Sequence, residues 1–101
     1  MTNIRTLIES KTNEMKNEII SFIQQLVQTP SLANDEGSVQ KIIFDKLQSL
    51  DLQSEAIPVK FEDIKNHPAF NDDGFSPDSR INVIGQWNTD KKGRSLILNG
   101  H

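Results

Sequence analysis

The chain has 101 residues, enough for one small domain or a part of one. Eleven Lys and Arg residues against fourteen Asp and Glu residues give a formal charge of −3, which argues against binding to nucleic acid or to anionic membranes. The absence of cysteine excludes disulfides, thiolate nucleophiles and cysteine-bound zinc. Because no apolar run is long enough to cross a bilayer and the N-terminus lacks a signal-peptide core, we expect a soluble cytoplasmic protein.

A first amphipathic helix is expected near the N-terminus. Apolar residues recur at helical spacing from Ile19 to Val27, which predicts a helix over about residues 12–28. A less regular apolar pattern at residues 4–8 extends it toward the N-terminus. Pro30 ends the helix, because proline disfavours helical dihedral angles in the residue before it.

A second amphipathic helix follows. Asn34 or Asp35 can cap its N-terminus. Its buried stripe is expected to contain Val39, Ile42, Ile43, Leu47 and Leu50. Both helices need a surface to cover, and we expect this surface to be a sheet, with Leu26 and Ile43 facing it.

Two strands can be predicted between residues 54 and 87. Residues 54–59 form the first, with Pro58 at an edge or at the strand end, since proline cannot donate to a ladder. Residues 81–87 form the second, in which Ile81, Val83 and Trp87 share one face. Between them, residues 61–80 form a long excursion that contains a short helical turn at about residues 62–66.

A third strand is expected close to the C-terminus. The polar residues 88–93 suit a hairpin loop, and residues 95–99 lack alternation, as expected for a strand that is covered on both faces. The element order predicts an α/β fold in which two N-terminal helices pack on a partial mixed sheet of about three strands with one hairpin. The apolar strand at residues 95–99 would keep an open edge.

The last predicted strand ends on Gly100 and His101. Imidazole is a frequent metal ligand, and a glycine at the tip of an apolar strand is a common way to direct it into a cleft. A catalytic zinc usually takes three protein ligands, so His101 alone is also compatible with a histidine that has no defined partner. His67 precedes a proline in a polar loop, where an exposed or hydrogen-bonded histidine is more common than a ligand. No catalytic or cofactor-binding residue is assigned.

Four segments, taken together and in order, resemble a known family. They are residues 20–31, 47–52, 80–85 and 94–101, the last of which closes on Leu98-Asn99-Gly100-His101. This arrangement resembles the opening of the acetylornithine deacetylase and succinyl-diaminopimelate desuccinylase family of zinc metallopeptidases, which also includes aminoacylases and glutamate carboxypeptidases. The resemblance covers nearly the whole chain from about Ile19.

The resemblance implies that residues 1–101 are the N-terminal part of one incomplete zinc-exopeptidase-like catalytic domain, with the rest of that domain and a dimerisation domain absent. His101 matches a histidine that binds one of two zinc ions in the family. The implied reaction is hydrolysis of the amide bond of an N-acyl amino acid or small peptide, with Zn²⁺ or the substitutes Co²⁺ and Mn²⁺. The complete protein would be a homodimer. We expect the 101-residue chain alone to be inactive, since one imidazole cannot form a three-ligand site.

An alternative from a different class is a small non-catalytic interaction module. It would pair with another chain through the exposed edge of residues 95–99. A cooperatively melting chain that ignores zinc would favour this alternative.

Overall fold

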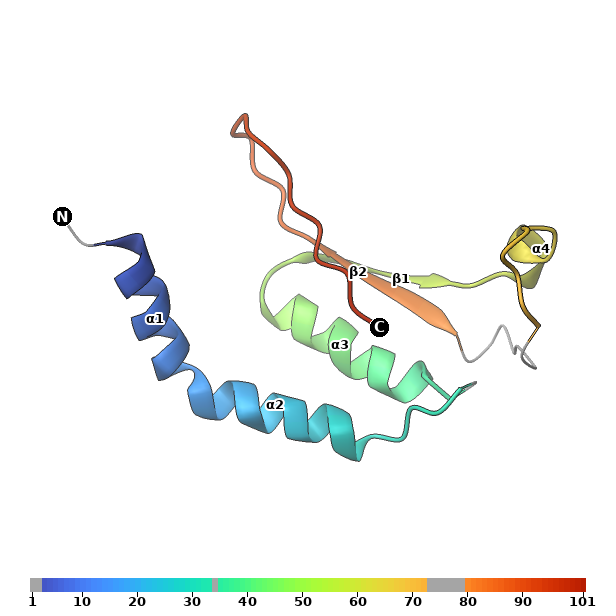
Figure 1. Ribbon diagram of the computed structural model, residues 1–101, viewed down its shortest axis with the longest axis horizontal. Helices are drawn as coiled ribbons and strands as arrows, with labels where there is room; N and C mark the ends of the chain where they lie inside the picture. The colour runs from blue at the N-terminus through green and yellow to red at the C-terminus, as the bar shows by residue number, and fades with distance from the viewer. Residues whose placement is uncertain (1–2, 34, 73–79) are drawn as a thin grey trace.

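The elements of the chain are spread out and do not gather around a common centre (Figure 1). A computed structural model describes residues 3–33, 35–72 and 80–101. The Cα radius of gyration is 17.4 Å, whereas a compact domain of about 100 residues has a radius of about 13 Å. The described elements are α1 (Ile4–Glu14), α2 (Lys16–Gln28), α3 (Gly37–Ser49), β1 (Gln53–Pro58), α4 (Phe61–Ile64) and β2 (Ile81–Gln86).

The predicted first helix is present as two helices, α1 and α2, which meet at Met15. The backbone N–H of Met15 donates to the carbonyl of Lys11 at 3.1 Å, and the Met15 carbonyl accepts from the N–H of Ile19 at 2.9 Å, so helical bonding runs across the junction. The predicted extension toward the N-terminus is confirmed. The predicted stop is also confirmed, because Thr29 before Pro30 is extended, with φ −88° and ψ 120°.

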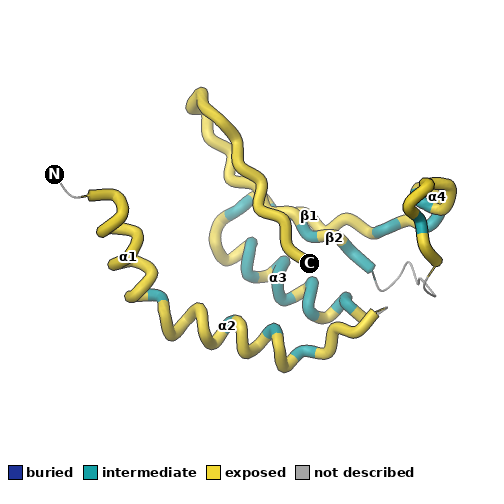
Figure 2. The backbone as a smooth tube through the Cα atoms, in the orientation of Figure 1, coloured by how far each residue is buried: buried dark blue, intermediate teal, exposed yellow. Residues whose placement is uncertain are grey.

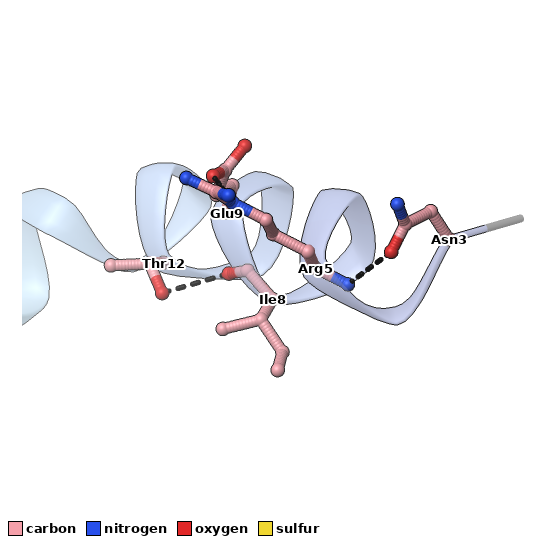
Figure 3. Close-up of polar contacts among 5 residues, drawn as sticks. All are labelled: Asn3, Arg5, Ile8, Glu9 and Thr12. Carbon is pink, nitrogen blue, oxygen red and sulfur yellow. Dashed lines mark hydrogen bonds and ion pairs between the residues drawn. The ribbon is translucent and has the colours of Figure 1, made fainter.

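The side-chain hydrogen bonds of α1 in the described chain are local (Figure 3). The Asn3 side-chain oxygen caps the helix by accepting the N–H of Arg5 at 2.9 Å. Arg5 Nε lies 3.0 Å from a carboxylate oxygen of Glu9, and the Thr12 hydroxyl donates to the Ile8 carbonyl at 2.8 Å. All of these side chains are exposed. An isolated helix of this length is only marginally stable in water, so α1 depends on its continuation into α2.

The two strands pair antiparallel, with Gln53 opposite Gln86 and Pro58 opposite Ile81. Pro58 is the last residue of β1, as predicted for a residue that cannot donate to the ladder. The pairing continues for one more bond, from the N–H of Val59 to the Arg80 carbonyl at 3.1 Å. The predicted helical turn in the connection is confirmed as α4.

α3 packs on both strands of the sheet. A Cβ atom built on Gly85 would lie 3.0 Å from Cδ2 of Leu47, so the glycine lets this leucine approach the backbone of β2. The side-chain amide of Gln40 donates to the Ile81 carbonyl at 3.0 Å. Four members of the predicted stripe are half-buried, and these are Val39, Ile42, Ile43 and Leu47.

The ends of α3 differ from the prediction. Asn34 lies outside the described residues, and the N-cap position is Glu36 in place of Asp35, without a side-chain capping bond. After the helix, Asp51 adopts a left-handed backbone with φ 58°, a conformation that aspartate tolerates better than most residues. Leu50 lies in this turn and is exposed, so its predicted burial is wrong.

The mixed helix and strand content is confirmed, but parts of the predicted architecture are wrong. The described sheet has two strands instead of three, since residues 95–99 form no strand. Trp87 lies beyond β2 and is 84% exposed. α2 is separated from the strands by α3, so Leu26 does not lie on a helix that covers the sheet (Figure 1). An apolar pattern gives a segment a local preference for helix or strand. Which strand it pairs with, and which element packs on it, depend on tertiary contacts.

None of the described residues is buried. Figure 2 shows half-buried positions mainly along α3 and exposed ones along most of α1, α2 and the C-terminal segment. Leu96, Ile97 and Leu98 are 82%, 87% and 87% exposed. Exposed apolar side chains also follow α1 and α2, and these are Ile4, Leu7, Ile8, Ile19, Ile20, Ile23 and Val27. Among the helices of the described segments, none has the length and apolar character needed to cross a bilayer.

The close approach of Leu47 to Gly85 makes a first prediction. Gly85→Val should push Leu47 away from β2 and lower the free energy of unfolding by about 1–3 kcal/mol, the usual cost of overpacking. The matched control is Gly93→Val, because a Cβ atom at Gly93 meets nothing within 4 Å. Urea unfolding followed by circular dichroism measures both variants. Equal midpoints for the two would contradict the packing of α3 on β2.

Candidate functional site

The predicted metal ligand, His101, is exposed at the end of the C-terminal segment. Among residues 3–33, 35–72 and 80–101, no group of three or more His, Cys, Asp or Glu side chains could hold a metal ion. A catalytic zinc takes three protein ligands and an open position, so the described residues do not fit a zinc site by themselves. No catalytic step through zinc follows from them.

The second histidine, His67, lies just after α4. Its Nδ1 atom accepts the backbone N–H of Ala69 at 3.1 Å, which places the proton of the neutral ring on Nε2. His67 was predicted to be exposed or hydrogen-bonded, and the structure shows both. α4 and the C-terminus lie apart in Figure 1, so the fold does not bring His67 to His101.

A hollow of about 310 Å³ lies beside α4. Its wall combines a carboxylate, an imidazole and a guanidinium with apolar surface, and the residues are Asp63, Ile64, His67, Ala69, Phe70, Asn71 and Arg80. Phe70 is held by an edge-to-face contact with Phe61, with ring centroids 5.4 Å apart. This volume is at the lower limit of small-molecule sites, and exposed His67 and Ala69 leave it open to water. The sequence signal for it was weak, because its residues come from α4, from the loop after it and from the position before β2.

One wall of this hollow is tied to α3. Arg80 Nη2 lies 3.6 Å from a carboxylate oxygen of Glu36, and both side chains are mostly shielded from solvent. The other oxygen of Glu36 is buried and has no hydrogen-bond partner in the described structure. Arg80 therefore joins the start of β2 to the N-terminus of α3, a role that sequence reasoning missed.

A second hollow, of about 260 Å³, lies between α2 and α3. Lys46 is its central residue: Nζ lies 5.0 Å from the ring centroid of Phe22 and 3.5 Å from a carboxylate oxygen of Glu18. Gln25, Ile42 and Asp45 complete the wall. These contacts hold α2 against α3 and make the hollow a packing seam between helices.

Comparison of the chain with models of protein families, with curated protein sequences and with solved structures gives no match. The resemblance to zinc metallopeptidases therefore stays a prediction that depends on the order of the sequence segments and on His101.

The isolated position of His101 predicts weak zinc binding by this chain. Zn²⁺ titrated into the 101-residue chain should give no saturating one-to-one isotherm in calorimetry, because a single imidazole cannot complete a three-ligand site. His101→Ala and its control His67→Ala should behave alike. Stoichiometric binding that only His101→Ala abolishes would show that further ligands gather around His101.

The seam between α2 and α3 predicts a specific role for Lys46. Lys46→Met should weaken the docking of α2 by about 0.5–1 kcal/mol and speed amide exchange in α2 about two- to fivefold. The control is Lys41→Met, because the Lys41 ammonium pairs with Asp45 of the same helix at 2.9 Å, and no ion pair from it to α2 is present among the described residues. Hydrogen exchange of the α2 amides, measured by NMR, distinguishes the two variants. If α2 exchanges equally fast in both variants, Lys46 does not hold the helices together.

Proposed function

We propose that this chain is the N-terminal part of the catalytic domain of a metal-dependent amidohydrolase or exopeptidase acting on N-acyl amino acids or small peptides. The observation that carries the proposal is the C-terminal segment. Leu96, Ile97 and Leu98 are more than four-fifths exposed and lead directly to His101. A segment of this composition is suited to the interior of a larger sheet, with its histidine at the strand end.

The exposed apolar surface supports the proposal in energetic terms. Full burial of one large apolar side chain contributes about 1.5–3 kcal/mol, so covering these three would contribute roughly 5–9 kcal/mol. The whole free energy of unfolding of a domain is about 5–15 kcal/mol. A sheet that continues past residues 95–99 would therefore supply a large part of the stability that the described chain lacks.

In the proposed enzyme, His101 would supply one ligand to Zn²⁺, with Co²⁺ or Mn²⁺ as possible substitutes. The other ligands and the general base would come from outside residues 1–101. α3 and the sheet would form part of the support for the strand that carries His101. The whole enzyme would be a homodimer, and the 101-residue chain would be inactive alone.

A second candidate function is an interaction module that binds another chain through residues 95–99. The favouring observation is the lack of internal backbone bonds: within the described part of the chain, residues 95–99 make no hydrogen bond. An unpaired apolar segment of this kind is a template for strand addition.

The proposal is tested first by the coding DNA beyond codon 101, where it predicts an open frame with aspartate two positions after His101. In the encoded longer protein, a chelator should abolish hydrolysis of N-acetyl amino acids and zinc should restore it. His101→Ala should lower kcat/KM by at least about 100-fold, since even residues that only orient a ligand contribute 10- to 100-fold.

His67→Ala is the matched control and should keep kcat/KM within about twofold, because its ring accepts a hydrogen bond from Ala69 of the same exposed loop and lies apart from His101. A hydrolase that is insensitive to chelators, or a frame that stops after codon 101, would overturn the proposed function.

A further inference from the structure

We propose that two copies of this chain pair through residues 95–99 as antiparallel strands related by a twofold axis at Ile97. The inference rests on the second candidate function and names its partner. It starts from the sequence Ser95-Leu96-Ile97-Leu98-Asn99, which has the same pattern in both directions: polar, Leu, Ile, Leu, polar. A twofold interface requires a self-complementary surface of this kind, because each copy presents the same patch to the other.

The pairing follows from strand geometry. With Ile97 on the axis, Leu96 of each copy lies opposite Leu98 of the other, and Ser95 lies opposite Asn99. Because successive side chains point to opposite faces, the four leucines gather on one face and the two copies of Ile97 meet on the other. All three apolar side chains are available for this contact, since each is more than four-fifths exposed.

Backbone and charge point to the same arrangement. Residues 95–99 make no hydrogen bond within the described part of the chain, so their N–H and C=O groups can form a ladder with a second copy. In the antiparallel register, Arg94 lies opposite Gly100. A parallel, in-register pair would instead place Arg94 opposite Arg94, and like charges directly opposite each other are destabilising. The twofold pair uses one open edge of each copy, and the two copies contribute equally to it.

The test uses the fact that the chain has no cysteine. Sedimentation velocity of the 101-residue chain over a concentration series should show a reversible monomer–dimer equilibrium. Ile97→Cys should then cross-link under mild oxidation, because its two sulfurs meet on the axis. Ser95→Cys is the matched control: its two sulfurs would lie about four residues apart along the ladder, roughly 13 Å, too far for a disulfide.

We expect Ile97→Cys to form the covalent dimer at least about tenfold faster than Ser95→Cys, since pairing raises the effective thiol concentration. Equal cross-linking of the two variants, or open-ended assemblies, overturns the twofold pair. A wild-type monomer at all concentrations also overturns it. If that monomer still melts cooperatively, the second candidate function survives with a different partner; without a cooperative melt, that candidate fails as well. The enzyme proposal is tested separately, on the longer protein.

Discussion

The contact between α3 and the two-stranded sheet is the interaction on which the rest of the structure depends. Gln40 bonds to Ile81 near one end of α3, and Leu47 lies on Gly85 near the other, so the helix and β2 run in the same direction. The two contacts are similarly spaced along both elements. The seven residues from Gln40 to Leu47 rise about 10 Å along α3, and the four residues from Ile81 to Gly85 rise about 13 Å along β2. Glu36 and Arg80 extend the same contact by an ion pair at 3.6 Å. One helix therefore aligns both strands.

The sheet is covered on one face by α3, which also explains why none of the described residues is buried. A helix covers one face of a two-stranded sheet, and nothing in the described structure covers the other face. α2 contacts α3 around Lys46, and α3 separates α2 from the strands. The apolar side chains along α1, α2 and residues 95–99 are thus left exposed.

The functional interpretation depends on what covers residues 95–99. Continuation of the sheet would bury Leu96, Ile97 and Leu98 and place His101 at a strand end, as in the proposed enzyme. Pairing with a second copy would bury the same three side chains. The two outcomes compete for these side chains, because a side chain buried in one contact is not available to the other. In the proposed function, His101 would bind a metal only in the first outcome.

The sequence by itself determined the local features. It predicted the end of α2 before Pro30, the stripe at Val39 and Leu47, and Pro58 at the end of β1, because these depend on sterics and periodicity within a few residues. It did not predict the exposure of Trp87 or the place of α2, since both depend on contacts far apart in the chain. Only the tertiary structure decided that, among the described residues, the segment 95–99 has no ladder partner and no cluster of metal-ligating side chains gathers at His101. A strand and a metal site both need groups from distant segments, and a local pattern does not contain that information.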